Sequence, residues 1–227
     1  MHAALKMRRR NPSVSPDLGV ERFFHDTGRL IAAPTPKVAS RSLSIAFRDL
    51  EGGSLDKRHY LPRDLRNTFP DHLIFSFVRN PWARIHSCWK DKIDNAISLG
   101  KLRILARFPD LRPFMPFEEF VEWLATPDGS DAVADRHWLS QVRHLDISGE
   151  SNGICDFIGR LEALDDDVAE ISRMSGVNLP PLGRRNQKGS PDWRAAYSDR
   201  ARRIVAERYA EDIERFGYRF DDGGDMA

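Results

Sequence analysis

The stretch from His72 to Ser87 constrains the fold of this chain more than any other part of it. It reads His-Leu-Ile-Phe-Ser-Phe-Val-Arg-Asn-Pro-Trp-Ala-Arg-Ile-His-Ser, an apolar run that ends at a cation and a proline. The apolar, β-branched and aromatic residues from Leu73 to Val78 predict a strand covered on both faces. Pro81 cannot continue a central strand but is accepted in the first turn of a helix, so we expect a helix over about 82–97.

This order of elements gives two polar residues a particular place. Arg79 would lie at the carboxyl end of the strand, the edge at which open α/β sheets bind ligands. Ser87 follows eight residues later, more than one turn into the expected helix. A guanidinium fork and a hydroxyl that converge at this edge could hold a phosphate.

Other segments repeat the order strand, loop, helix. We expect strands at 29–33 and 154–161, and helices at 41–50, 63–67 (weakly), 117–125, 165–175 and from 198 to 216, with 135–147 as a helix end or an irregular lid. Units of this kind at this spacing indicate an α/β fold with three layers, α/β/α, around a central parallel sheet.

Length and composition limit the number of domains and the kinds of ligand that are possible for this chain. Its 227 residues suffice for one α/β domain, and no long linker interrupts them. We expect a disordered leader over residues 1–20, one domain over 21–222 and a tail over 223–227. The 35 basic and 34 acidic residues nearly cancel, which argues against a general nucleic-acid binder and requires any anion site to be local.

The cysteines and the apolar runs narrow the class further. The two cysteines, Cys88 and Cys155, exclude a disulfide scaffold and a cysteine zinc site, and are expected to be buried thiols. No signal peptide follows the basic N-terminus, and no apolar run approaches the length of a membrane span. The sequence therefore favours a soluble, cytoplasmic protein.

The loop over residues 34–42 has the layout of a phosphate cradle. Lys37 would add a full charge to the backbone N–H groups at the start of the following helix. However, the pattern GxxxxGK[ST] is absent, no glycine lies between Gly28 and Gly52, and no set of Mg²⁺ ligands is nearby. An ordinary nucleoside triphosphatase is thus disfavoured. Alone, such a loop would be read as a surface turn; its pairing with the Arg79 strand favours a ligand site.

Together, the segments Pro36–Leu43 and Phe77–Ser87 resemble the carbohydrate-type sulfotransferases of family 2, which use 3′-phosphoadenosine 5′-phosphosulfate as donor. Further likenesses are the His137-Trp138 pair, the segment from Asp156 to Glu162, and the ending from Tyr209 to Tyr218, so that the resemblance runs from about residue 29 to residue 220. It implies the P-loop-like nucleotide-binding fold of that family and the release of adenosine 3′,5′-bisphosphate.

The resemblance also implies roles for particular residues. The first segment would wrap the 5′-phosphosulfate, and Arg79 and Ser87 would grip the 3′-phosphate. A basic loop near residue 188 is similar to the Arg-Lys-Gly…Trp segment of cytosolic sulfotransferases, although a solvated basic turn is the alternative. The implied cofactor-binding residues are Lys37, Val38, Ala39, Ser40, Arg41, Ser42, Leu43, Arg79, Ser87, Arg185, Lys188 and Gly189.

Two positions depart from the family pattern. Ala39 replaces the usual glycine of the first loop, so that either the turn avoids positive φ or the cradle is altered. Asn80 replaces the commoner aspartate. In addition, the Golgi members carry a membrane anchor and disulfides, and this chain has neither, as expected of a soluble, bacterial-type member.

Sulfuryl transfer requires a cation at the leaving phosphate and a base for the acceptor. Lys37 is the candidate cation. His59 is the first candidate base, with a surface histidine as the alternative, and His137 is the second, with a core or substrate-orienting histidine as the alternative. Arg84 could reach the ligand edge or pair with an acid in its own helix. Glu162 could support the site or pair with Arg160.

We therefore expect an enzyme that sulfates a hydroxyl, rather than an amine, of a carbohydrate or small metabolite, without a metal. One rival is a metal-dependent nucleotide kinase or phosphotransferase on the same fold. The other is a non-catalytic nucleotide-binding protein that lost the base. The sequence between residues 95 and 150 carries no acceptor motif, and nothing in the chain indicates an oligomeric state.

Overall fold

A computed structural model describes the backbone of residues 20–25, 29–50, 53–60, 62–108, 110–182 and 192–222. Within these ranges, the side chains of residues 20–25, 54–60, 62 and 63 lie outside the description. The expected leader and tail lie almost wholly outside it as well.

The core of the fold is a five-stranded sheet in the order β3-β1-β2-β4-β5. Its strands are β1 (Val20–His25), β2 (Leu30–Ala32), β3 (Gly53–Tyr60), β4 (Leu73–Val78) and β5 (Phe157–Arg160). The pairs β2–β4 and β4–β5 are parallel, whereas β1 is antiparallel to both β2 and β3. The expected parallel sheet is therefore present over β2, β4 and β5, whereas the reversed strand β1 and its neighbour β3 were not predicted from the sequence.

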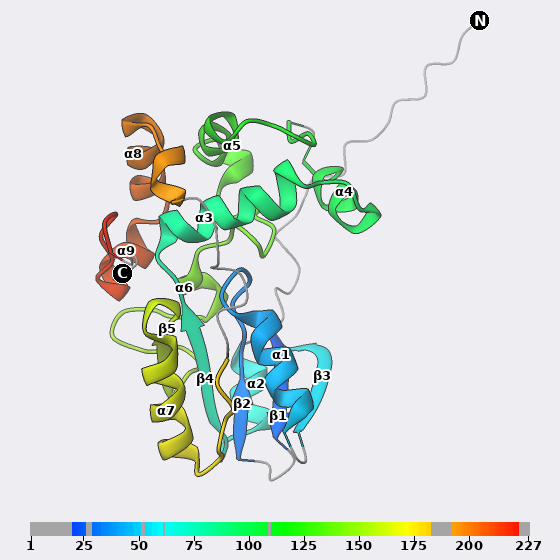
Figure 1. Ribbon diagram of the computed structural model, residues 1–227, viewed down its shortest axis with the longest axis vertical. Coiled ribbons are helices and arrows are strands. Elements are labelled where there is room, and N and C mark those ends of the chain that lie inside the picture. The colour runs from blue at the N-terminus through cyan, green and yellow to red at the C-terminus, as the bar shows by residue number, and fades with distance from the viewer. Residues whose placement is uncertain are drawn as a thin grey trace, which may run out of the picture.

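Helices cover both faces of the sheet because β2 and β4 alternate their side chains between two apolar layers. Leu30, Phe75 and Phe77 pack against α1 (Ser40–Asp49) and α7 (Leu164–Ser175), which lie in front of the sheet in Figure 1. Ile31 and Ile74 face the layer that contains α2 (Pro62–Thr68), α6 (Gln141–His144) and α9 (Ala210–Phe216). The expected α/β/α arrangement is confirmed.

A third apolar cluster lies beyond the carboxyl end of the sheet, where α3 crosses the end of β4 (Figure 1). It contains side chains of α3 (Pro81–Trp89), the π-helix η1 (Lys90–Asp94), α4 (Leu99–Leu105), α5 (Phe117–Leu124) and α8 (Asp199–Arg208). Short 3₁₀ turns complete the described chain at Pro127–Gly129, Leu161–Ala163 and Trp193–Ala196. Among the described residues, no helix is both long and apolar enough to cross a membrane.

Two expected helices differ from the observed ones. The helix expected over 82–97 is α-helical only to Trp89 and then widens into the π-helix η1. The helix expected from residue 198 is divided at Tyr209, whose backbone (φ −116°, ψ 30°) is not helical. Gly217 ends it in the left-handed conformation, as a C-terminal glycine does.

Candidate functional site

The loop between β2 and α1 forms a tight turn that points backbone groups at the carboxyl end of the sheet. Lys37 and Ala39 both have positive φ, 70° and 50°, and the N–H of Val38 donates to the carbonyl of Thr35 at 3.2 Å. Ala39 thus takes the left-handed conformation that the family's glycine would supply, and the turn does not avoid positive φ. Helix α1 then begins without a side chain capping its first turn, the arrangement that favours an anion.

The second segment is organised by Asn80, which caps α3 at the point where β4 ends. Its side-chain oxygen accepts hydrogen bonds from the N–H groups of Trp82 and Ala83, and Pro81 fills the first helical position. Its amide nitrogen donates to the carbonyl of Arg219 at 2.8 Å. An aspartate at position 80 could not donate this hydrogen bond, so the asparagine provides a contact that the commoner aspartate of the family would lack.

The two segments touch through two arginines of the second. Arg79 Nη1 donates to the carbonyl of Lys37 at 3.4 Å, and Arg84 Nε donates to the carbonyl of Pro36 at 3.2 Å. Arg84 is completely buried, and its Nη1 and Nη2 atoms have no hydrogen-bond partner among the residues that the structure describes. Arg84 therefore reaches the ligand edge rather than pairing with an acid of its own helix.

Lys37 belongs to a cluster of three lysines around one carboxylate. Asp91 of η1 accepts from Lys37 and Lys92 at 3.1 Å and from Lys101 of α4 at 3.0 Å. Burial lowers the pKa of Lys37, and the Asp91 charge partly opposes this. Burial alone would raise the pKa of Asp91, but the lysines hold it well below its usual value. The cluster carries an excess of positive charge beside the loop.

His137 forms a buried dyad with an aspartate two residues earlier in the chain. Its Nδ1 lies 2.5 Å from Asp135 Oδ1, and Asp135 also bonds Arg107 at 3.1 Å. Burial lowers the pKa of His137 although Asp135 acts in the opposite direction, so the ring is neutral at neutral pH and donates through Nδ1. The other ring nitrogen, Nε2, is then the one able to accept a proton.

Cys88 connects the dyad with the lysine cluster. The thiol is fully buried, burial raises its pKa to about 12, and it lies near enough to Lys37 and Asp135 for both charges to act on it. Lys92 likewise acts electrostatically on His137. The lysine cluster and the dyad therefore lie near one another.

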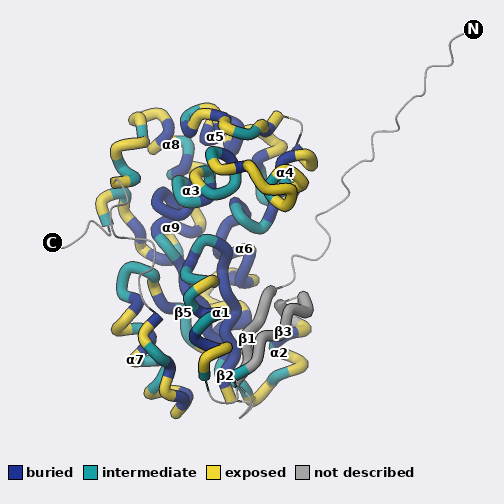
Figure 2. The backbone as a smooth tube through the Cα atoms, turned by 45° about the vertical axis from the view of Figure 1, so that its right-hand side comes forward, coloured by how far each residue is buried: buried dark blue, intermediate teal, exposed yellow. Residues whose placement is uncertain are grey.

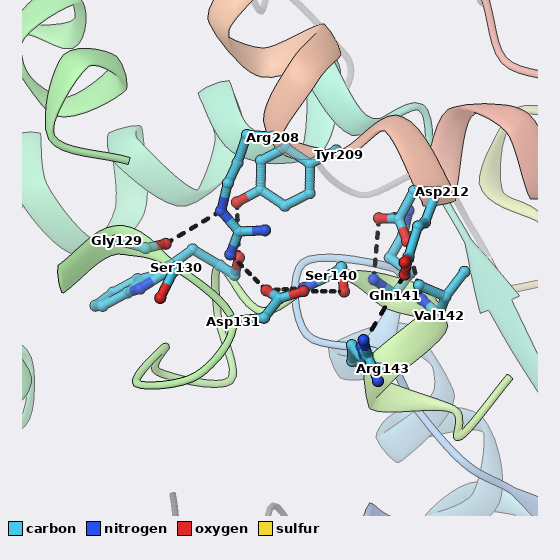
Figure 3. Close-up of polar contacts among 12 residues, drawn as sticks. Gly129, Ser130, Asp131, Ser140, Gln141, Val142, Arg143, Arg208, Tyr209 and Asp212 are labelled. Carbon is cyan, nitrogen blue, oxygen red and sulfur yellow. Dashed lines mark hydrogen bonds and ion pairs between the residues drawn. The ribbon is translucent and has the colours of Figure 1, made fainter. Parts of the chain in front are cut away.

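Two carboxylates, Asp131 and Asp212, hold the segment around Gln141 (Figure 3). Gln141 exchanges two hydrogen bonds of 2.9 Å with the backbone of Arg79 and is itself held by Asp212, whose oxygens also accept the N–H groups of Gln141 and Val142 at 2.9 Å. Asp131 bonds Ser140 and Arg208. The contacts of Gln141, supported by Asp212, fix the Arg79 backbone.

The remaining predicted residues fall into three groups. Val38 and Leu43 are fully buried, so only their backbone groups could reach a ligand. Ser87 is half-buried on α3, and Ser40, Arg41 and Ser42 form the first turn of α1. Glu162 accepts from the Asn80 N–H and the Tyr218 hydroxyl rather than pairing with Arg160. The side chain of His59, on β3, and all of Arg185, Lys188 and Gly189 lie outside the described residues.

Four contributors to the site were not predicted from the sequence. These are Asp91, Lys92, Lys101 and Asp135. Asp135 could have been found from its place two residues before a candidate histidine. The other three gather around a π-helix, which a 3.6-residue period does not predict.

Comparisons with known proteins found a matching family model and several similar proteins. The family model described as "Sulfotransferase family" matches residues 21–219. Carbohydrate sulfotransferase 12 of Mus musculus is 27% identical over 168 residues, which cover 63% of this chain and 39% of that protein. Carbohydrate sulfotransferase 10 of Xenopus laevis is 25% identical over 240 residues (87% of this chain, 67% of that protein), and that of Homo sapiens is 23% identical over 239 residues (88% and 67%). The chain thus spans 39% to 67% of the length of these relatives. No solved structure matches it significantly.

Proposed function

The chain belongs to the sulfotransferase family, and from this we propose that it transfers a sulfuryl group from 3′-phosphoadenosine 5′-phosphosulfate to a hydroxyl of a carbohydrate, in the cytoplasm. The observation that carries the proposal is the direct contact between the two anion-binding segments, in which Arg79 donates to the carbonyl of Lys37. Names of the relatives support a carbohydrate acceptor.

The residues present fit such a donor. The uncapped start of α1 and the Lys37 ammonium suit the 5′-phosphosulfate, while Arg79 and Ser87 suit the 3′-phosphate. When bound, the donor supplies an activated sulfuryl group on a phosphate leaving group. To act on that phosphate, Lys37 must exchange Asp91 for the ligand, and Lys92 and Lys101 remain to neutralise the carboxylate.

His137 is the proposed base among the described side chains. The new bond joins the acceptor oxygen to sulfur, the bond from sulfur to the leaving phosphate oxygen breaks, and the acceptor proton passes to Nε2 of His137. Asp135 would stabilise the imidazolium that results. His59 remains the rival for this role.

Binding and transfer assays test the proposal. By calorimetry we expect adenosine 3′,5′-bisphosphate to bind at micromolar or tighter concentrations, and Arg79→Ala to weaken it by about 2–4 kcal/mol through loss of a charge-assisted contact. Arg48→Ala, at the exposed end of α1, is the matched control. Binding of ATP with Mg²⁺ in place of the bisphosphate would support a kinase instead.

Transfer of labelled sulfate to a panel of carbohydrates then separates the two histidines. We expect His137→Ala to reduce turnover about 10²-fold or more while bisphosphate affinity is kept. The same loss in His59→Ala, with His137→Ala active, would move the base to His59. Tight bisphosphate binding without transfer to any acceptor would favour the non-catalytic alternative.

A further inference from the structure

A group of apolar side chains is exposed on one part of the surface. Five large hydrophobic side chains of the described chain are strongly exposed, and four of them lie between residues 97 and 114: Ile97 (78%), Leu99 (73%), Phe114 (63%) and Leu102 (38%). The fifth, Met174, lies on α7. Figure 2 shows α4 at the edge of the molecule, largely in the colour of exposed residues.

We call these four side chains the apolar patch. Leu99 and Leu102 are three residues apart on α4 and so share a face of it. The carbonyl of Ile93 accepts hydrogen bonds from both Ala96 (3.3 Å) and Phe114 (3.0 Å), which places Phe114 beside the segment that leads to Ile97. Phe114 has a φ of 61°, a strained conformation for a bulky residue. Exposed apolar side chains on a fixed backbone indicate a binding surface.

Positive charge predominates in the segment that carries the apolar patch, although Lys101 and Arg107 are paired with Asp91 and Asp135. Between Asp94 and Asp110 the sequence has no acidic residue, and it has three cations, Lys101, Arg103 and Arg107. Arg103 is exposed, and the side chain of Arg107 is 57% exposed although it bonds Asp135. Two copies of the chain that met through this surface would bring these cations together, so self-association is disfavoured.

We propose that the apolar patch docks the protein on an anionic lipid surface. The apolar side chains would enter the boundary between headgroups and acyl chains, and the cations would meet the anionic headgroups. Lys101 on the same helix bonds Asp91, which bonds Lys37, so the docked face borders the proposed donor site. The inference rests on exposure and charge and is independent of the proposed chemistry.

Vesicle co-sedimentation of the full chain tests the inference. We expect binding to vesicles of equal phosphatidylcholine and phosphatidylglycerol, weak binding to phosphatidylcholine alone, and partial release by salt. The double variant Leu99→Ser, Phe114→Ser should bind the mixed vesicles about tenfold or more weakly, because apolar burial is lost. Arg103→Gln should weaken binding only to the anionic vesicles. Met174→Ser is the matched control and should bind as the parent does.

Three outcomes would overturn the inference. They are no binding to either vesicle, equal binding by the double variant and the parent, or a dimer in light scattering that the double variant abolishes. The last result would make the apolar patch an interface between copies. Unchanged circular dichroism and urea midpoint of the double variant would establish that it is folded.

Discussion

Single residues hold the cradle loop in a conformation that side chains rarely adopt. Lys37 and Ala39 both have positive φ and flank Val38, whose side chain is fully buried. The carbonyls of Pro36 and Lys37 are bonded by arginines of the neighbouring segment. Tertiary contacts therefore maintain a turn that glycine would adopt without strain.

Replacing Ala39 by glycine should relieve this strain. We expect Ala39→Gly to increase the free energy of unfolding by about 0.5–1 kcal/mol. Glycine removes the steric cost of the left-handed conformation in the folded state, and this gain exceeds the free-energy cost of the greater conformational entropy of the unfolded chain. Urea titration would measure the change. Ala46→Gly, in the right-handed interior of α1, should instead lower the free energy by about 1 kcal/mol or more. A decrease for Ala39→Gly as well would contradict the argument.

At the scale of elements, the π-helix η1 determines which side chains meet the cradle. It continues α3 with a wider turn and presents Asp91 and Lys92 beside Lys37, while α4 contributes Lys101. Because a π-turn changes the phase of the helix, sequence periodicity could not predict this meeting. The site thus depends on a local irregularity between two regular helices.

The Asp91 carboxylate should determine the pH range over which the proposed donor site works. Lys37 binds an anion only when protonated, so affinity is lost as the pH rises through its pKa. Burial lowers that pKa and Asp91 opposes the shift, so Asp91→Asn should move the loss of bisphosphate affinity to lower pH. Calorimetry from neutral to alkaline pH would measure this. Asp94→Asn, in the same π-helix, is the control, and identical profiles for the parent and Asp91→Asn would refute the role.

Much of this arrangement could be predicted because it is encoded locally. Apolar alternation and a proline indicated β4 and α3, and periodicity indicated α1 and α7. Strands β1 and β3 were missed because their sequences, Val-Glu-Arg-Phe-Phe-His and Gly-Ser-Leu-Asp-Lys-Arg-His-Tyr, are too polar to stand out, and their pairing is with distant parts of the chain.

For the molecule as a whole, the segment that contains Arg79 and Arg84 holds a loop far from it in sequence, the one that contains Pro36 and Lys37. Arg79 lies where the 3′-phosphate of the donor is proposed to bind, yet it bonds the Lys37 carbonyl of the 5′ end, and Arg84 bonds the preceding carbonyl, that of Pro36. The contacts connect the helical cluster beyond the sheet with the sheet itself. Occupancy of one end of the donor site should therefore affect the other.

Nucleotide fragments would show at which end of the donor site Arg84 acts. We expect Arg84→Met to weaken the binding of adenosine 5′-monophosphate about tenfold, while adenosine 3′-monophosphate binds nearly as before. The hydrogen bond that is lost is the one to the Pro36 carbonyl, in the loop proposed to bind the 5′ end of the donor. Arg84→Lys, which keeps the charge, should recover part of the affinity, and Arg200→Met on the exposed face of α8 should change neither ligand. Equal weakening of both fragments by Arg84→Met would indicate a general loss of folding.

The hydrogen bond from Asn80 to the carbonyl of Arg219 spans 139 residues, and this separation has a consequence for the order of events during biosynthesis. The residues that hold the Arg79 segment in place, Asp212 among them, leave the ribosome long after the segment itself. At about 5–20 residues per second, the delay is on the order of ten seconds. Until then the nascent chain has its cradle loop but not the support behind Arg79. Nucleotide binding should therefore begin only when the last helix has docked, so that a ribosome-bound chain stalled before residue 212 would fail to retain the bisphosphate.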